Sequence, residues 1–346
     1  MTRLDRLRAL LVERGIAALY VGDLVNVRYL TGFTGSNGAL LVPADADAVF
    51  LTDGRYQDQA RAEVEVADHV ITRDLTGESR RRGVTHAETH ALTVDAWRAL
   101  GEPAAAGRVV ERLREVKDDT EIAHLREACR ISVAALEELL AGPLVGRTER
   151  DLARDLEHRM VALGAEDKAF DTILASGPHT AIPHHSPTDR VVQPGELLKI
   201  DFGARVAGYH ADCTRTVVTG AADAWQREVH AVVRASQAAG VAALVAGRPI
   251  GDADRAARAV LDDAGWLHAF TTGLGHGVGL QIHEDPFVSA AHPGRLSSRT
   301  VLTMEPGIYV PDTGGVRIED TVLVTDLDHG APEVLTTTTT ELREIT

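Results

Sequence analysis

Apolar residues in the first third of the chain fall into short runs that alternate with helix-like stretches. The runs AALYVG, GALLV and AVFLTD are typical of buried strands. YLTGFTGSNG is rich in glycine, serine and threonine and predicts a loop between two strands, whereas LTDGRYQDQARAEV predicts a strand that leads into a helix. This alternation favours a small α/β domain.

The pattern changes near Asp118. Asp118 and Glu121 have the spacing of a helix-capping pair, and apolar residues then recur at mostly helical spacing until Gly142-Pro143. A second helix is predicted from Thr148 to Gly164. We therefore expect two domains, residues 1–118 and 119–346.

From Phe170 onward the pattern predicts an α+β domain. We expect strands near 170–175, 191–203, 210–219, 301–310 and 316–325, and helices near 223–246 and 251–265. Two helix pairs flanking antiparallel strands fit this order. The β-branched run Thr336–Thr340 predicts a terminal edge strand.

Composition and charge narrow the function classes. A length of 346 residues suits two domains, and 44% hydrophobic with 25% charged residues is typical of a globular protein. The formal net charge of −15 argues against nucleic acid or an anionic membrane as partner. The two cysteines exclude a disulfide framework, and no apolar run is long enough for a signal peptide or a membrane span. A cytoplasmic location is expected.

Acidic residues stand where apolar strands are predicted in the second domain. Each has apolar or glycine neighbours: Asp201, Asp212, Glu305 and Glu319. A buried acid is costly unless it is paired, hydrogen-bonded or bound to metal. One such acid would ordinarily be a structural ion pair or a cap, but four together indicate a cation site.

Spacing strengthens this interpretation. Asp201 and Asp212 lie on two apolar runs, and a hairpin turning near Val206-Ala207 would place them opposite each other on one side of a sheet. His276, between two glycines, adds an imidazole. Carboxylates with one imidazole suit Mn, Zn, Co or Fe(II). The surrounding glycine run matches neither a dinucleotide motif nor a P-loop.

The motifs that carry these residues resemble a known family. PHHS (183–186), IDFGARVAGYHADCTRT (200–216), GLGHGVGLQIHEDP (273–286), TMEPGIY (303–309) and GVRIEDT (315–321) are similar in type and order to those of the M24, or pita-bread, metallopeptidases. The resemblance implies five metal ligands: Asp201, Asp212, His276, Glu305 and Glu319. In this assignment two of them, Asp212 and Glu319, bridge both metals.

The first third narrows the subgroup. RYLTGFTGSNGALLV and LTDGRYQDQA resemble the creatinase-type N-terminal domain of aminopeptidase P and prolidase, which methionine aminopeptidases lack. The resemblance adds His184, His283 and Arg317 as catalytic or supporting residues. Many proline-specific relatives carry a histidine four residues before the metal histidine, and here that position is Thr272.

The resemblance implies an exopeptidase that cleaves the Xaa-Pro bond at the N-terminus of small peptides. Two divalent ions per chain, manganese expected and zinc, cobalt or iron as alternatives, would supply a bridging hydroxide. Glu305 would take its proton, and His283 or His184 would stabilise the oxyanion. A homodimer or larger homo-oligomer is expected. Alternatives are an M24 aminopeptidase of other or broad specificity, metal-free creatinase-like hydrolysis, and a non-catalytic peptide-binding protein.

Overall fold

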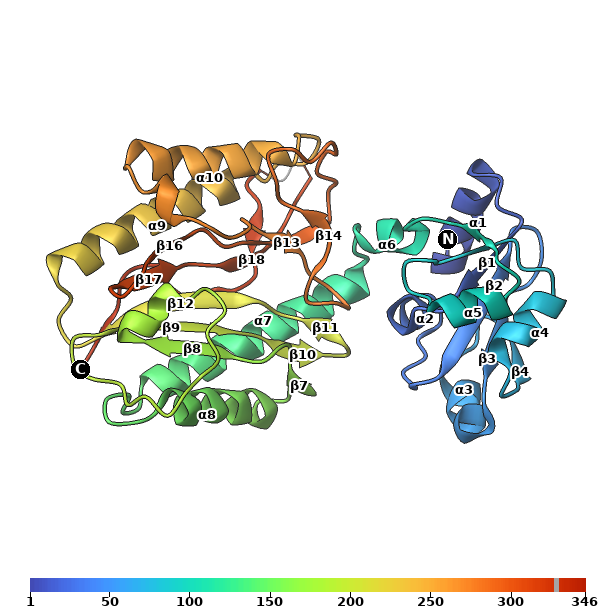
Figure 1. Cartoon of the computed structure of the whole chain (residues 1–346), viewed down its shortest axis with the longest axis horizontal. Coiled ribbons are helices and arrows are strands. Elements are labelled where there is room, and N and C mark those ends of the chain that lie inside the picture. The colour runs from blue at the N-terminus through green and yellow to red at the C-terminus, as the bar shows by residue number, and fades with distance from the viewer. Residues whose placement is uncertain (327–329) are drawn as a thin grey trace. The chain divides into compact units, whose positions relative to one another are not determined.

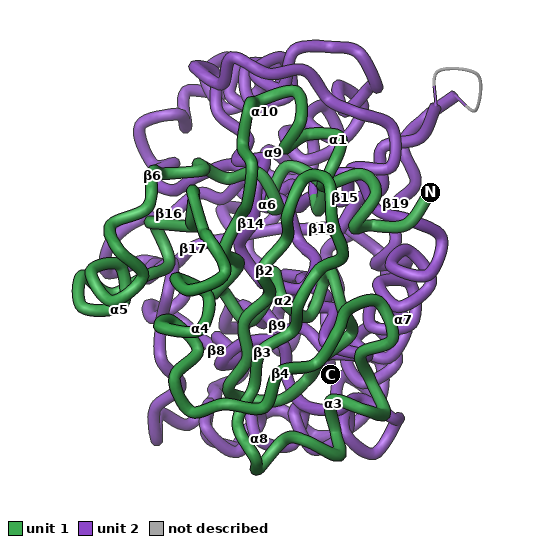
Figure 2. Tube along the Cα trace, turned by 90° about the vertical axis from the view of Figure 1, so that its right-hand side faces the viewer, with its two compact units in different colours: residues 1–114 green, residues 115–346 purple. Residues whose placement is uncertain are grey.

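The computed structural model describes residues 1–326 and 330–346 and divides into two compact units, Met1–Arg114 and Glu115–Thr346 (Figure 2). No helix in the described ranges is long and apolar enough to cross a membrane. Each unit has its own buried apolar clusters.

The first unit is a mixed six-stranded sheet with helices, as the alternating pattern predicts. The sheet order is β4-β3-β2-β1-β5-β6. Its strands are β1 Ala18–Val21, β2 Gly38–Pro43, β3 Val49–Thr52, β4 Asp68–Ile71, β5 His86–Ala87 and β6 Ala104–Ala105. Its helices are α1 Arg3–Glu13, α2 Leu24–Thr31, α3 Gln57–Glu63, α4 Leu75–Arg81, α5 Val94–Ala99 and α6 Val109–Arg114, with a 3₁₀ turn η1 Gly54–Tyr56. The loop predicted from Tyr29 begins later, because α2 continues to Thr31 and ends at Gly32 in the left-handed conformation.

The second unit confirms the predicted α+β order. Its α-helices, over the described residues, are α7 Asp119–Leu140, α8 Glu149–Ala162, α9 Ala224–Ala242 and α10 Gly251–Asp263. Figure 1 shows α9 and α10 on one side of the strands and α7 and α8 on the other. The predicted capping pair is present at the start of α7, where Asp118 accepts from the Glu121 N–H and Glu121 accepts from the Asp118 N–H.

Short, mostly antiparallel strands make up the middle layer of this unit. They are β7 Asp167–Lys168, β8 Ile173–Ser176, β9 Leu197–Phe202, β10 Ala204–Val206, β11 Tyr209–His210, β12 Cys213–Thr219, β13 His276–Gly277, β14 Glu284–Phe287, β15 Val301–Met304, β16 Gly307–Val310, β17 Gly314–Arg317, β18 Asp320–Leu323, β19 Glu333–Val334 and β20 Glu344–Ile345. Two 3₁₀ segments lie between these elements: η2 Gly177–Ala181 between β8 and β9, and η3 Leu267–Ala269 between α10 and β13. The strands predicted at 301–310 and 316–325 are each interrupted, and the interruptions fall at Glu305-Pro306 and Ile318-Glu319.

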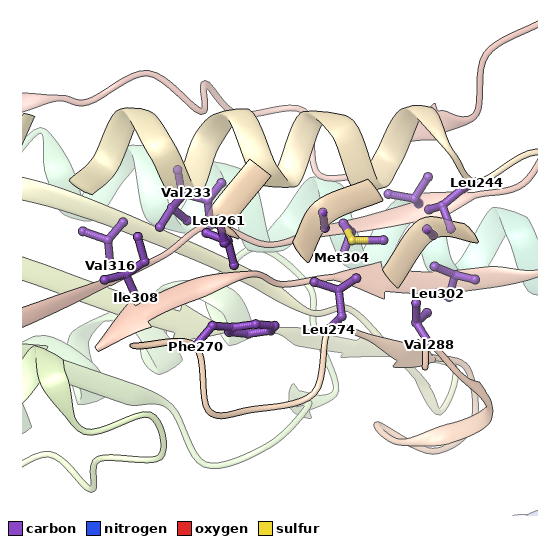
Figure 3. Packing of buried hydrophobic residues seen from close by; sticks show 14 of the residues in the cluster. Val233, Leu244, Leu261, Phe270, Leu274, Val288, Leu302, Met304, Ile308 and Val316 are labelled. Carbon is purple, nitrogen blue, oxygen red and sulfur yellow. The ribbon is translucent and has the colours of Figure 1, made fainter. Parts of the chain in front are cut away.

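Apolar side chains from α9, α10 and the strands interlock beneath the two helices. Figure 3 shows Val233 of α9, Leu261 of α10, Met304 of β15 and Ile308 of β16 in this cluster. Close packing of this kind fixes the positions of the strands next to Glu305 and Glu319. At Gly240 of α9, an added Cβ would lie 2.4 Å from the Met304 sulfur, so the helix and the strand are in direct contact.

The Thr336–Thr340 edge strand is a wrong prediction. No strand is assigned there, and pairing at the C-terminus is made instead by β20, parallel to β12. Carbonyls of the threonine run accept hydrogen bonds from the buried guanidinium of Arg215, to Thr338 O at 2.9 Å and Thr339 O at 2.9 Å. β-Branched residues favour a strand, but the arginine satisfies these carbonyls without a neighbouring strand.

Candidate metal centre

One cavity of ≈ 650 Å³ in the second unit is lined by all five side chains predicted to bind metal. They reach it from separate elements: Asp201 in β9, Asp212 just before β12, His276 in β13, Glu305 just after β15, and Glu319 between β17 and β18. Residues more than 100 positions apart in the sequence meet there, and an antiparallel bridge between Thr214 and Glu319 joins the two parts of the chain. The structure thus brings the predicted set together in one place.

The hairpin that supplies the two aspartates has a different register from the predicted one. The turn is centred on Ala207 and Gly208, both at positive φ, and Asp201 is paired with Thr214 rather than with Asp212. Turning one residue later shifts the pairing by two positions, which leaves the aspartates diagonal and not directly opposite.

Glycines beside His276 let the backbone pack tightly around the cavity. A Cβ at Gly275 would lie 2.1 Å from Thr303 O, and one at Gly277 would lie 2.4 Å from Asp285 O. Only glycine fits such an approach. Nδ1 of His276 lies 3.1 Å from Gly277 O, and donation from this nitrogen leaves the Nε2 lone pair free.

The acidic side chains and His276 approach each other closely. Nε2 of His276 lies 3.6 Å from Asp212 Oδ2 and 3.5 Å from Glu305 Oε1. Asp212, His276 and Glu319 each offer one ligand atom, and these atoms all lie within 4.8 Å of one another. This is a donor set of oxygen and nitrogen that divalent transition metals accept.

Three carboxylate oxygens in this cavity are buried without a hydrogen-bond partner in the described residues. They are Asp201 Oδ1, Asp212 Oδ1 and Glu319 Oε1. The second oxygen is paired in two of these groups, because Arg317 donates to Asp201 Oδ2 at 2.5 Å and Thr214 donates to Glu319 Oε2 at 2.7 Å. Buried oxygens are normally satisfied, so the unpaired ones fit a bound cation.

Burial and mutual repulsion disfavour the charged forms of these acids. Burial, followed by the charge of Glu319, holds the pKa of Asp212 well above its usual range. Burial, followed by the charge of Glu305, does the same for the pKa of Glu319. The pKa of Glu305 rises to about 7, mainly through burial. A divalent cation would reverse these shifts, since it favours the ionised form of each ligand.

Two of the histidines that line the cavity, His276 and His283, favour the neutral form. Burial, with a smaller effect of His283, lowers the pKa of His276 to about 4. Burial also lowers the pKa of His283, whose ring packs edge-on to that of His276 with centroids 4.3 Å apart. A neutral imidazole is the form that binds a metal.

Arg317 lies beneath the cavity and is almost fully buried. Besides Asp201, it donates to the Tyr309 hydroxyl at 2.9 Å, to Pro183 O at 3.1 Å and to Thr214 Oγ1 at 3.1 Å. Burial alone would lower its pKa, but Tyr309 and the surrounding carboxylates hold the pKa well above the usual arginine value. Arg317 therefore supplies the permanent positive charge beside these acids.

The other two predicted catalytic residues, His184 and His283, also line the cavity, and both are exposed. Their neighbour His185 lines it too but is buried, and its Nε2 is 2.8 Å from Glu149. Thr272, which stands in place of the histidine of many relatives, lines the same cavity. Its hydroxyl has no hydrogen-bond partner within the described ranges.

Two residues near the cavity were missed at the level of sequence. Lys199 is completely buried in β9, where burial and Arg317 lower its pKa to about 6. A lysine inside the apolar run LLKIDF was the available signal. Glu149 resembles an ordinary residue of the first helical turn, so nothing in the sequence marks it.

A second acid–histidine group consists of Glu149, His179 and His185. Glu149 is fully buried and already saturated, because it also accepts from the N–H and hydroxyl groups of Ser176 and Thr188. These donors lower its pKa to about 2 despite burial. This group is a hydrogen-bonded anchor rather than a second metal centre.

Comparison with known proteins supports the same picture. Residues 123–326 match the model of metallopeptidase family M24, and residues 3–130 match the creatinase/prolidase N-terminal domain. The chain is 36% identical over 342 residues to the Bacillus subtilis peptidase YqhT, covering 94% of this chain and 95% of that one.

Solved structures agree over both units. The chain is similar to an Xaa-Pro dipeptidase from Bacillus anthracis, with a TM-score of 0.93 and 33% identity, covering 99% of this chain and 98% of that one. It is also similar to an X-Pro aminopeptidase from Thermotoga maritima, with a TM-score of 0.89 and 32% identity over 100% of each chain.

Proposed function

Because the chain belongs to metallopeptidase family M24, we propose that it is a metal-dependent exopeptidase that hydrolyses the Xaa-Pro bond at the N-terminus of short peptides. The observation that carries this proposal is the set of buried, unpaired carboxylate oxygens beside His276 in an open cavity. The similarity to an Xaa-Pro dipeptidase and to an X-Pro aminopeptidase supports the substrate class.

Two divalent ions would be held by the five cavity ligands. In this proposal Asp212 and Glu319 are shared by both ions, Asp201 belongs to one, and His276 and Glu305 belong to the other. Bound ions of this kind lower the pKa of a water molecule and polarise a carbonyl group. The unpaired oxygens of Asp201, Asp212 and Glu319 fit such a role.

The remaining chemistry falls to side chains of the cavity. Glu305 is proposed to accept the proton of the attacking water and to pass it to the leaving nitrogen. His283 and His184 are exposed in the cavity and can donate hydrogen bonds to the developing oxyanion. Arg317 orients Asp201 through their 2.5 Å contact.

The test is a metal-reconstitution assay with three peptides. Protein stripped by chelator and reloaded with Mn would be given Ala-Pro, Ala-Pro-Ala and Ala-Ala-Ala. We expect metal-dependent cleavage of the proline peptides, with the preferred length separating a dipeptidase from an aminopeptidase. Cleavage of Ala-Ala-Ala alone would support the broad-specificity alternative. Metal binding without cleavage of any peptide would support a peptide-binding protein.

Finer features are also proposed. The resemblance supports manganese as the metal and a homodimer or larger homo-oligomer. Two free, buried cysteines support a cytoplasmic location. Metal analysis of protein purified from its own host would test the manganese, and light scattering would test the oligomer. Domain limits at residues 118 and 119 remain a prediction that limited proteolysis would check.

A further inference from the structure

The loop that carries His184 is held mainly through its backbone. The ring of His184 is exposed in the cavity, and within residues 1–326 and 330–346 it makes no hydrogen bond. The position of this imidazole therefore depends on the groups that fix the chain on either side of it. Those groups are the ones that decide where the imidazole meets a substrate.

Lys199 holds the segment directly before His184. Its Nζ donates to the carbonyls of Thr180 at 3.1 Å, Ile182 at 2.6 Å and Pro183 at 3.3 Å. The amine is fully buried and lies 5.1 Å from the centre of the Tyr309 ring. A buried lysine surrounded by three carbonyls of one loop is directed toward that loop.

The last of these carbonyls belongs to the peptide group that joins Pro183 to His184. Arg317 donates to the same oxygen at 3.1 Å, so two basic side chains hold this peptide group. Lys199 also stands two residues before Asp201 in β9, and alternate residues of a strand share a face. One strand therefore sets both a proposed metal ligand and the loop of His184.

The far side of His184 is held independently. His185 Nε2 lies 2.8 Å from Glu149, and the Thr188 N–H donates to the same carboxylate at 3.0 Å. Glu149 holds the segment after His184, and Lys199 holds the segment before it. Removal of either contact would therefore release only one of the two segments. A shift of the loop, rather than its unfolding, is the expected consequence.

We propose that Lys199 is a positioning residue that holds His184 at the place where it serves the peptide substrate. This inference rests on the proposed function for its catalytic part only. A simpler role would be to neutralise Asp201. The geometry favours the loop, because the paired oxygen of Asp201 accepts from Arg317 at 2.5 Å while the hydrogen bonds of Lys199 go to carbonyls.

A double-mutant cycle tests the connection to His184. Lys199→Met should lower kcat for the preferred proline peptide roughly 10- to 100-fold, since small misplacements of a catalytic group have effects of this size. KM should change less than kcat does, by under about 3-fold, because the misplacement of a catalytic group acts mainly on the chemical step. In a His184→Ala background the same substitution should have almost no further effect. Independent, multiplicative losses would overturn the proposal.

Two further variants make the result specific. Lys168→Met removes one lysine charge from the partly exposed strand β7 and should leave kcat unchanged. Lys199→Gln keeps N–H donors and should recover part of kcat, and it replaces the methionine variant if that one does not fold. Metal content should be equal in all variants, because an effect through Asp201 would lower it.

Hydrogen exchange gives a readout that needs no activity. In the metal-free protein, peptides covering residues 177–188 should exchange at least 5-fold faster in Lys199→Met than in wild type or Lys168→Met, a size typical of local opening after loss of a few contacts. Unchanged exchange would overturn the proposal. If the wild type cleaves no peptide, the proposed function fails, while this exchange result still decides whether Lys199 holds the loop.

Discussion

Asp201 divides its carboxylate between Arg317 and the cavity: Oδ2 accepts from the guanidinium at 2.5 Å, and Oδ1 has no partner in the described part of the chain. Arg317 is thereby a fixed neighbour of the proposed metal site and not one of its ligands. It pairs with one carboxylate, whereas burial and mutual repulsion keep the pKa values of Asp212 and Glu319 well above their usual range. The stability of the second unit should therefore depend on the positive charges beside these carboxylates, which are Arg317 and any bound metal ions.

Replacing Arg317 by methionine should destabilise the metal-free protein by about 3–5 kcal/mol, the usual cost of leaving one partner of a buried ion pair alone. Urea unfolding of the metal-free variant would measure the loss. Mn should restore part of it, because the ions supply positive charge beside Asp201. Arg317→Lys is the matched control. Its stability should lie between those of the wild type and of Arg317→Met, since lysine keeps the charge without the planar guanidinium. Equal stability of all forms would contradict this account.

The metal-free protein should become more stable as the pH falls from 8 to 6.5. The folded pKa of Glu305 is about 7, and those of Asp212 and Glu319 are well above their usual values. A raised folded pKa means that the folded state binds protons that the unfolded state does not. Stability therefore increases by about 1.4 kcal/mol per pH unit for each such proton.

Glu88 of the first unit, with a pKa of about 7, adds to this increase in stability. Lys199, with a folded pKa of about 6, opposes the increase throughout the range, because the unfolded lysine holds a proton that the folded one has lost. Below pH 6.5 His276, with a folded pKa near 4, opposes it as well, so the window ends there. Urea titrations at pH 8, 7.3 and 6.5 would measure the slope. Saturating Mn should remove the part due to the metal ligands and leave the parts due to Glu88 and Lys199, and Glu88→Gln would identify the first of these. A metal-free slope of zero would refute the raised pKa values.

Glu305→Gln should lower kcat about 100- to 10,000-fold, the range that a general base contributes. Metal should still bind, though more weakly, because Asp212, His276 and Glu319 keep their ligand atoms within 4.8 Å. Single-turnover cleavage and metal analysis of the same sample would separate the two effects. Glu341→Gln, at an exposed glutamate, is the control for the lost charge. Normal turnover in Glu305→Gln would exclude it as the proton acceptor.

The sequence predicts this fold well where local signals are strong. The capping pair Asp118 and Glu121 and the helical spacing after it correctly locate α7. The set of cavity acids was also predictable, because an ionisable residue in an apolar strand needs a partner. Each of these signals can be recognised from the few residues on either side of it.

What the sequence could not predict depends on partners far along the chain. The turn at Ala207-Gly208 places a non-glycine residue at φ 49, which is uncommon, so Gly208 is the one local signal for a turn one residue later than predicted. Glu149 and Lys199 act only through their contacts with the loop of His184. Glu149 is 30 or more residues from its partners in that loop, and Lys199 is 16 or more residues from its own. No local pattern marks such contacts.

Lys117→Met should destabilise the second unit by about 3–5 kcal/mol. Lys117 and Glu284 form a buried ion pair, with Nζ 2.7 Å from Oε1, and both side chains are at most 4% exposed. Glu284 directly follows His283, so the loss should also reduce kcat. The double variant with Glu284→Gln should recover most of the stability, since it removes the uncompensated charge. Urea unfolding of the single and double variants measures the coupling, and strict additivity would show that the pair contributes nothing.

Thr272→Val should leave stability unchanged or raise it by about 1 kcal/mol, because the hydroxyl it removes is buried without a partner. Thr272 is one of the residues that line the cavity, so we expect a bound peptide to supply the missing partner of its hydroxyl. Loss of one such hydrogen bond, worth about 1 kcal/mol, should raise KM about 5-fold with little change in kcat. Thr313→Val, at an exposed threonine, should change neither value. An unchanged KM together with higher stability would mean that the hydroxyl stays unpaired when peptide binds, and that residues other than Thr272 determine the fit of proline.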